Sequence, residues 1–404
     1  SSRMSLMPVA TALERLLASA AEHPPTAVVK VPLADALGCV LAEPVVAAAD
    51  VPPWDNSAMD GYALASSDLA AAMASGLPVS QRIMAGMAPR PLQAGTCARI
   101  FTGAPLPAGA DAVQMQENVA QQGEVAQLQA PVVPGQNVRR RGQDIVAGAQ
   151  VIAAGVRLRP QELGVIASVG LAEVSVRQPL RVAVVSTGDE LVEPGEALAP
   201  GQIYNSNRFT LIGLLKGLGQ TVLDAGILPD DLAATHARLR ELSAQADVII
   251  TSGGVSVGEA DCLGQALREG GAVDLWKLAI KPGKPFTLAA YADTPVLGLP
   301  GNPAATLVTF LLLVRPYLLT RLGALETATA QFELPAGCAW NRAGSRDEYL
   351  RARVEQGAVQ LAGNQSSGVL SSASQATGLL CVPAGQTFAA GDLVRYLPFS
   401  GLLG

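Results

Sequence analysis

Residues 248–261 read VIITSGGVSVGEAD, and they decide how the rest of the chain is interpreted. The apolar run at 248–250 stops at the Gly-rich segment 251–254, and Glu259 and Asp261 then open an expected helix. A strand, a Gly-rich turn and a helix often hold an anion. Two carboxylates at the mouth of such a site would repel a bound phosphate, so the stretch raises the question of what else binds there.

Composition places the chain among globular proteins and excludes several classes of function. The 404 residues are 49% hydrophobic and 15% charged, which suits about two to four domains. The net charge is −6, with no basic run beyond Arg139-Arg140-Arg141, so we expect no nucleic-acid partner. Five scattered cysteines favour a reducing, cytoplasmic compartment, and two histidines argue against His-based metal or nucleophile chemistry.

We also expect no membrane span and no signal peptide. The longest apolar run, 307–314, is followed by Arg315 and Pro316 and is too short to cross a bilayer. The N-terminus lacks a basic segment followed by an apolar core.

Strand and helix patterns alternate from residue 181 to about 326, which predicts a central three-layer α/β domain with a mostly parallel sheet. Within it, 206–219 is an expected helix capped by Ser206 or Asn207. Short strands and turns on both sides of this region predict β-rich domains. The expected domains are an elongated N-terminal one formed by 1–50 and 146–178, a small β-rich one at 51–145, the α/β domain at 179–326, and a C-terminal β domain at 327–404.

Ligands of such sheets bind at the carboxyl ends of the strands, and that rule selects the loops after them. The segment KPGKP at 281–285 holds Lys281 and Lys284 in a rigid Pro/Gly frame, which favours an oxyanion site. Gly301 and Asn302 lie at an expected helix N-terminus, where Asn302 can cap.

Three of the selected loops are acidic, and this answers the opening question in outline. They carry the pairs Asp189 and Glu190, Asp230 and Asp231, and Glu259 and Asp261. Their repulsion is relieved if a hard cation such as Mg²⁺ binds carboxylate and phosphate oxygens together. The chain has no G-K-[ST] segment here, so a P-loop ATPase is excluded. The loops predict a site for a phosphate-bearing ligand with its metal, beside lysines for a second anion.

Seven segments in this order carry a resemblance to a known family: NSAMDGYA, TGAPLPAGAD, STGDEL, SNRFTL, TSGGVSVGEAD, KPGKP and GLPGNP. Together they resemble the molybdopterin molybdenumtransferase family, which includes bacterial MoeA and the gephyrin E domain. The resemblance implies an elongated homodimer of four-domain subunits with a MogA-like central domain. It also implies the Mg²⁺-dependent reaction of adenylyl-molybdopterin with molybdate, which gives molybdenum cofactor and AMP.

The resemblance also implies site residues. It assigns catalytic roles to Asp60, Asp144, Glu190, Asp230, Asp261, Lys281 and Lys284. It assigns substrate-binding roles to Thr102, Ser252, Gly253, Gly254, Gly301, Asn302, Arg351 and Ser372. Glu190 and Asp261 are the implied metal ligands, and Asp231 competes with Asp230 for one role. The chain departs from the family pattern at Gln143, where Glu is usual, and after KPGKP, where Phe-Gly often follows.

Two alternatives to this enzyme stay open. A scaffold protein is one, because the gephyrin E domain also binds receptor tails. The other is a molybdopterin adenylyltransferase or nucleotide-cleaving relative, against which the two β-rich domains argue. The resemblance further implies an active site shared between the two subunits, and other proteins of cofactor biosynthesis are candidate partners.

Overall fold

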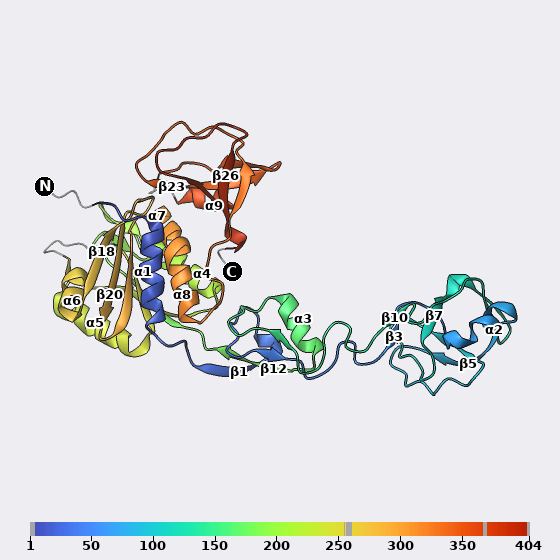
Figure 1. Cartoon of the computed structure of the whole chain (residues 1–404). Helices are drawn as coiled ribbons and strands as arrows, with labels where there is room; N and C mark the ends of the chain where they lie inside the picture. Colours follow the sequence, from blue (N-terminus) through green and yellow to red (C-terminus); the bar gives the residue numbers. More distant parts are fainter. Residues whose placement is uncertain (1–4, 254, 256–260, 367–369, 402–404) are drawn as a thin grey trace.

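The computed structural model describes residues 5–253, 255, 261–366 and 370–401. The chain is elongated, with an α/β unit and a C-terminal β unit at one end, a narrow stalk, and a small β-rich unit at the far end (Figure 1). The predicted fold class, an α/β sheet combined with β-rich domains, is confirmed.

A six-stranded sheet with the order β16-β13-β17-β21-β20-β18 forms the centre of the α/β unit. The first four strands run parallel to one another, and β20 is antiparallel to both of its neighbours. Its strands are β13 (Arg181–Ser186), β16 (Thr221–Ile227), β17 (Val248–Ser252), β18 (Val273–Lys277), β20 (Pro285–Tyr291) and β21 (Thr294–Leu299). A short parallel pair lies beside them, β14 (Leu191–Val192) with β15 (Ile203–Tyr204).

Helices cover both faces of this sheet because successive residues of the buried strands point to opposite sides. Val182 and Val184 pack with α4, α7 and α8, whereas Ala183 and Val185 pack with α5 and α6. These helices are α4 (Ser206–Gly217), α5 (Leu232–Gln245), α6 (Cys262–Gly270), α7 (Pro303–Thr309) and α8 (Arg315–Arg321). The cap of α4 is Asn205, whose Oδ1 accepts from the Arg208 N–H at 3.4 Å, so the predicted cap at Ser206 or Asn207 was one or two residues too late.

The helices α7 and α8 are joined by a π-helical turn, Phe310–Val314, into one helical stretch. This stretch, Pro303–Arg321, is the one described helix that is long and apolar enough to cross a membrane, and 83% of its most apolar window is buried inside the protein. Buried core helices of globular proteins have the same character.

The N-terminal helix α1 (Val9–Ala21) packs against α8 rather than within the stalk (Figure 1). Its buried residues Ala12, Leu16 and Ala20 belong to the same apolar cluster as Leu318. The α/β unit therefore includes α1, which the expected domain boundaries placed in the elongated N-terminal domain.

The stalk is built from two passages of the chain, one going out and one returning. β1 (Val28–Pro32) pairs with β12 (Glu173–Arg177), and β2 (Val45–Val46) pairs with β11 (Gln150–Ile152), both antiparallel. Helix α3 (Pro160–Ser168) packs on them, and a cluster including Leu41, Leu158 and Ile166 fills the interior. The small β-rich unit is thereby held away from the α/β unit.

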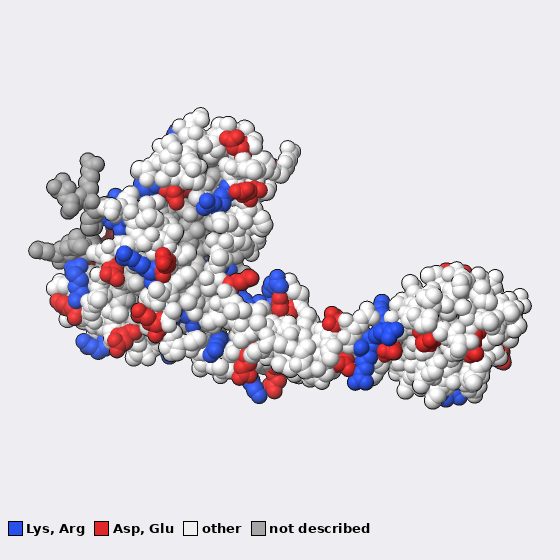
Figure 2. Space-filling model, viewed as in Figure 1, with Lys and Arg blue, Asp and Glu red and all other residues white. Residues whose placement is uncertain are grey.

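The small β-rich unit contains a sheet with the order β7-β4-β6-β5-β9-β8 and the short helix α2 (Leu69–Ala74). Its strands are β4 (Gly61–Leu64), β5 (Leu77–Ile83), β6 (Cys97–Ile100), β7 (Ala112–Met115), β8 (Val119–Gln122) and β9 (Val125–Leu128), with the separate pair β3 (Asn56–Ser57) and β10 (Val138–Arg139). Basic atoms gather where this unit meets the stalk (Figure 2), the position of the exposed Arg139, Arg140 and Arg141.

The C-terminal unit is a β-sheet that receives one strand from the α/β unit. The order is β19-β23-β25-β26-β22, with β24 also paired to β23. Its members are β22 (Phe332–Pro335), β23 (Asp347–Glu355), β24 (Ala358–Leu361), β25 (Gly378–Val382) and β26 (Leu393–Pro398), with helix α9 (Ser371–Gln375). The added strand, β19 (Ile280–Lys281), lies in the lysine loop and runs parallel to β23.

Candidate functional site

The selected loops do converge at one edge of the central sheet. Ser186, at the end of β13, is in register with Ile227 on one side and Ser252 on the other, and Ser252 is in register with Leu299. The strands are parallel, so their carboxyl ends bring these loops together.

Gly253 lets two of these loops touch. Its φ is +97°, and a Cβ there would lie 2.2 Å from the carbonyl oxygen of Thr187. Thr187 closes the contact by donating its hydroxyl to the Gly253 carbonyl at 3.1 Å, and its N–H to the Ser252 carbonyl at 3.1 Å. Only glycine has both the backbone conformation and the space that this approach requires.

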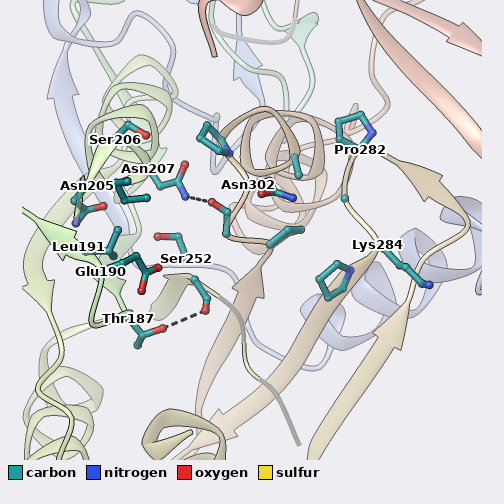
Figure 3. A pocket seen from close by; sticks show the side chains of 18 of the residues that line it. Thr187, Glu190, Leu191, Asn205, Ser206, Asn207, Ser252, Pro282, Lys284 and Asn302 are labelled. Atoms are coloured by element: carbon teal, nitrogen blue, oxygen red, sulfur yellow. Dashed lines mark hydrogen bonds between the residues drawn. The ribbon is translucent and has the colours of Figure 1, made fainter. Parts of the chain in front are cut away.

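A cavity of about 530 Å³ opens between these loops (Figure 3). Glu190, Ser252 and Asn207 lie on one side of the view and Lys284 on the other. The predicted site residues that line the cavity are Glu190, Ser252, Gly253, Lys281, Lys284, Gly301 and Asn302. Asn302 occupies the predicted N-cap position of α7, but its side chain makes no capping hydrogen bond with the described backbone.

Three cationic side chains line the cavity, and one of them was not predicted. Lys281 and Lys284 are exposed, while Pro282 and Gly283 between them are buried. A Cβ on Gly283 would lie 2.6 Å from the Thr309 methyl group, so the loop fits closely on α7. Arg346, from the C-terminal unit, lines the same cavity and donates Nη1 to the Ile280 carbonyl at 3.1 Å.

Asn207 is a second lining residue that sequence analysis missed. Only 9% of it is exposed, and its Nδ2 donates to the Gly301 carbonyl at 2.8 Å. Its Oδ1 is buried and has no hydrogen-bond partner among the described residues. A buried acceptor without a donor is unfavourable, so this amide is suited to a ligand that donates a hydrogen bond.

Asp230, Asp231 and Asp261 do not line the cavity, and all three lie close to Cys262. Asp230 accepts from the Cys262 thiol at 3.3 Å, and the N-caps Asp231 and Asp261 accept from the N–H groups of Ala234 and Gly264. The pKa of Cys262 is raised, chiefly by the hydrogen bond to Asp230 and then by burial. The negative charges of Asp230, Asp231 and Asp261 raise it further. Asp231 is the N-cap of α5, whereas Asp230 accepts from the Cys262 thiol.

The structure does not bring the predicted metal ligands together as a ready cation site. Glu190 lines the cavity and Asp261 does not. Within the described ranges, no three His, Cys, Asp or Glu side chains are grouped closely enough to hold a metal ion. Gly254 and Glu259 lie outside the described residues. The carboxylates that are present are hard oxygen donors, so they fit Mg²⁺ when phosphate oxygens of a ligand complete its coordination.

The predicted residues of the small β-rich unit lie at the other end of the molecule (Figure 1). Asp60 accepts from the Thr102 N–H at 2.9 Å and from its hydroxyl at 3.0 Å. Both hydrogen bonds lower the pKa of Asp60, and the one from the backbone N–H has the larger effect. Asp144 is exposed where this unit joins the stalk. None of the three lines the cavity of the same chain.

Arg351 and Ser372 are buried inside the C-terminal unit. Arg351 is 0% exposed, and its Nε donates to the Ser372 hydroxyl at 3.2 Å. Its Nη2 donates to the carbonyls of Asn364 and Ser366 at 3.4 and 3.2 Å. Burial lowers the pKa of Arg351. In this structure the side chain holds a loop in place and does not line the cavity.

Comparison with known proteins finds the same order of parts. Family profiles match three consecutive stretches: the MoeA N-terminal region (domain I and II) at 7–170, a probable molybdopterin binding domain at 183–320, and the MoeA C-terminal region (domain IV) at 333–399. A molybdopterin molybdenumtransferase of Haemophilus influenzae is 40% identical over 385 residues, covering 92% of this chain and 94% of that protein. The chain belongs to the molybdopterin molybdenumtransferase family.

Other relatives agree with this membership. Molybdopterin molybdenumtransferase 2 of Mycobacterium tuberculosis is 38% identical over 375 residues, covering 88% of this chain and 91% of that protein. The crystal structure of a molybdopterin biosynthesis MoeA protein from Pyrococcus horikoshii superposes with a TM-score of 0.83 at 28% identity, covering 98% of this chain and 100% of that one. As a member of the molybdopterin molybdenumtransferase family, this chain is a transferase of molybdenum cofactor biosynthesis.

Proposed function

We propose that the cavity at the sheet edge binds adenylyl-molybdopterin and molybdate, and that the protein transfers molybdenum to molybdopterin with release of AMP. The observation that carries this proposal is the set of three cations, Lys281, Lys284 and Arg346, around one cavity. The name of the Haemophilus influenzae relative supports molybdopterin as the acceptor.

Two anions have to be held close together for this reaction, and the lining suits both. Lysine ammonium groups compensate the charge of an oxyanion such as molybdate, and a guanidinium can bind phosphate or molybdate oxygens in pairs. The Arg346 side chain is tied to the Ile280 carbonyl, which places its charge next to the lysine loop. Positioned cations of this kind stabilise the negative charge that develops as AMP leaves.

Asn207 is proposed to orient the organic part of the substrate. Its unpartnered Oδ1 can accept a hydrogen bond, while its Nδ2 is held by Gly301. A pterin carries N–H groups, so it offers the donor that this acceptor lacks. The amide thereby contributes to the choice of substrate without taking part in a proton transfer.

Mg²⁺ is proposed as the metal, held by Glu190 and Asp261 together with phosphate oxygens of the substrate. When bound, it supplies further charge stabilisation for the departing phosphate. The carboxylate of Asp261 already accepts from the Gly264 N–H, which fixes its orientation at the start of α6.

We further propose that the protein acts as a homodimer with a shared site. Asp60, Thr102 and Asp144 lie at the far end of the stalk from the cavity of their own chain (Figure 1). A two-fold dimer can place them at the partner's cavity and form two identical composite sites.

All five cysteines are free thiols, which supports a reducing, cytoplasmic compartment.

Reconstitution tests the reaction. Purified protein, adenylyl-molybdopterin, molybdate and Mg²⁺ are combined, and AMP and active cofactor are measured. We expect Lys281→Ala and Lys284→Ala to raise the molybdate concentration needed for half-maximal AMP formation by about tenfold or more, because each removes a charge from the oxyanion site. Lys277→Ala, at an exposed position of β18 outside the lining, is the matched control.

The proposal fails if both loop variants form AMP like the parent at limiting molybdate. Mg²⁺ is tested separately with Asp261→Asn. This variant is expected to need more Mg²⁺ for AMP release while keeping its circular dichroism spectrum. An unchanged Mg²⁺ dependence removes Asp261 from the metal site but leaves the lysine result standing.

A further inference from the structure

Asp60, in the small β-rich unit, is presented by a backbone that hydrogen bonds hold from more than one side. The Ser57 hydroxyl accepts from the Met59 N–H at 3.2 Å and donates to the Met59 carbonyl at 2.5 Å. The carbonyl of Asp60 itself accepts from the Gln116 N–H at 2.9 Å. The carboxylate is exposed, but the chain that carries it has little freedom to move.

The residue after Asp60 is held as closely, and here an arginine takes part. A Cβ on Gly61 would lie 2.0 Å from the Gln114 carbonyl oxygen, a close approach of two backbones that requires glycine. The Gly61 carbonyl accepts from Arg99 Nη1 at 3.2 Å, and Arg99 Nη2 donates to Gln116 Oε1 at 2.5 Å. One guanidinium therefore joins the beginning of β4 to the 3₁₀ turn that begins at Gln116.

The sheet register brings Arg99 to the same face as Asp60. Arg99 on β6 is in register with Tyr62 on β4, and Tyr62 follows Asp60 by two residues, which is the repeat of a strand. The Arg99 Cζ lies 5.1 Å from the centre of the Tyr62 ring and 4.6 Å from the centre of the Phe101 ring. The guanidinium is thus held by two aromatic rings as well as by its two acceptors.

Arg82 on β5 offers a comparison within the same face. It is in register with Arg99, and its Cζ lies 4.9 Å from the centre of the same Phe101 ring. Its side chain makes neither of the hydrogen bonds that Arg99 makes to Gly61 and Gln116. Arg82 therefore shares the charge and the ring of its neighbour without a hold on the backbone around the carboxylate.

The charge of Arg99 also acts on Asp60. The two hydrogen bonds from Thr102, the backbone one more strongly, lower the pKa of Asp60; desolvation opposes them, and the positive charge of Arg99 lowers the pKa further. A surface that covered the carboxylate would remove it from water and raise this pKa. A guanidinium already in place beside it counteracts that change.

Two other ionisable side chains on the elements around Asp60 have partners of their own. The Tyr62 hydroxyl is directed to Gln121 Oε1. The Glu117 carboxylate accepts from Gln116 Nε2 at 3.5 Å. Neither side chain brings a positive charge to the carboxylate.

We propose that Arg99 is a positioning residue for Asp60. It fixes the backbone that presents the carboxylate, and it keeps the carboxylate ionised when a partner subunit removes it from water. The inference rests on the proposed function, because Asp60 is proposed to act at the partner's cavity. In the composite site, Asp60 then contributes a fixed carboxylate beside the three cations of that cavity.

AMP formation by Arg99→Met, measured across pH at saturating Mg²⁺, tests the inference. We expect kcat to fall about tenfold or more, because methionine provides neither the charge nor the two donors. The acidic limb of the pH profile is expected to move to higher pH, since Asp60 then protonates more readily. The molybdate concentration for half-maximal rate is expected to stay unchanged, because Lys281 and Lys284 are intact. Arg82→Met is the matched control and is expected to behave like the parent.

NMR titration of the Asp60 carboxyl distinguishes positioning from a purely structural role. The pKa of Asp60 is expected to rise in Arg99→Met and to stay close to the parent value in Arg99→Lys, which keeps the charge. A general loss of stability lowers the amount of active protein but leaves this pKa and the pH profile of the remainder unchanged. A parent-like pKa together with a parent-like pH profile in Arg99→Met overturns the inference, whatever its rate.

Mixing of subunits separates this inference from the proposed function. The Arg99→Met chain refolded with the Lys281→Ala chain is expected to regain activity, because each mixed dimer has one intact site. Refolded with the Asp60→Ala chain it is expected to regain none, because both lesions lie in the β-rich unit.

The two possible failures give different results. If Asp60→Ala forms AMP like the parent, the proposed role of Asp60 fails and the role of Arg99 fails with it. If Asp60→Ala is inactive while Arg99→Met and Arg82→Met both match the parent, the proposed function stands and only the role of Arg99 is wrong.

Discussion

The two ends of the molecule carry different kinds of site residue. At the sheet edge of the α/β unit, the lining is fixed by close contacts within the chain, among them Gly253 against Thr187 and Asn207 against Gly301. At the small β-rich unit, Asp60 and Thr102 are exposed and bind each other. The first end forms a cavity and the second presents polar groups on a surface.

This difference indicates how a complete site is formed. A cavity with three cations can bind anions by itself, whereas Asp60 and Asp144 are exposed and lie outside the lining of that cavity. Exposed polar groups become effective when another surface removes them from water. The comparison therefore supports the proposal that the α/β unit binds the ligands and that the β-rich unit contributes through a partner subunit.

Subunit complementation is expected to show the largest effect on AMP formation. Its result can contradict the proposed division of roles between the two ends of the molecule. Asp60→Ala and Lys281→Ala homodimers are each expected to lose about a hundredfold or more in AMP formation. Refolding the two together makes half of the dimers mixed, and each mixed dimer has one intact site. Activity is then expected to recover to about a quarter of the wild-type value. Refolding each variant alone is the control.

If the mixture recovers nothing, every site carries one lesion and the site lies within one chain. The small β-rich unit would then have to reach its own cavity by a large rearrangement of the stalk.

Gly253→Ala tests whether the cavity depends on close backbone contact. The added Cβ would meet the Thr187 carbonyl at 2.2 Å with φ at +97°, so we expect a loss of about 3 kcal/mol in the free energy of unfolding. Gly213→Ala, within α4 and with nothing within 4 Å of the added Cβ, is the control. It is expected to stabilise by about 0.5–1 kcal/mol. Urea unfolding measures both, and equal effects would show that the Gly253 contact is not tight.

Arg351→Met separates a structural arginine from a ligand-binding one. It leaves the carbonyls of Asn364 and Ser366 without their donor, so we expect destabilisation by about 2–3 kcal/mol. Arg395→Met, at an exposed position of β26, should change stability by less than about 0.5 kcal/mol. A fully stable Arg351→Met chain with lost AMP formation would instead support the ligand role implied by the family resemblance.

Thr102→Val gives the smallest expected effect. It removes the hydroxyl donor and keeps the backbone donor, so the pKa of Asp60 should rise part of the way toward its ordinary value. A carboxyl group with a lowered pKa stabilises the fold above its unfolded-state pKa, and that contribution is lost as the pH falls through its folded-state pKa. NMR titration of the Asp60 carboxyl measures the shift. An unchanged pKa would assign the whole effect to the backbone N–H.

Much of the α/β unit could be predicted because its signals are local. The buried runs that became β13 and β17 and the Gly-rich loop after β17 are visible in the sequence, and parallel strands bring their ends together without further information. That is why Lys281, Glu190 and Asn302 were found in advance. The resemblance to the family added Asp60, Thr102 and Asp144, which no local pattern connects with the cavity.

Other features could not be predicted because they depend on contacts between distant segments. Periodicity identified helical spacing near residues 8–20, but it does not reveal that α1 packs on α8. Arg346 lies in a polar loop, and only the pairing of β19 with β23 brings it to the cavity. The burial of Asn207 and Arg315 depends on side chains from distant segments that surround them in the folded protein. A polar residue at a helix start is ordinarily expected to cap or to face solvent.

The strand β19 belongs by sequence to the α/β unit and by hydrogen bonding to the C-terminal sheet. Ile280 and Lys281 are in register with Asp347 and Glu348. The Asp347 N–H also donates to the Ala279 carbonyl at 3.1 Å. A rotation of the C-terminal unit about its attachment therefore displaces the lysine loop with it, and a ligand that clamps the lysines restrains that rotation. Because this short strand belongs to both units, the orientation of the C-terminal unit and the geometry of the anion site change together.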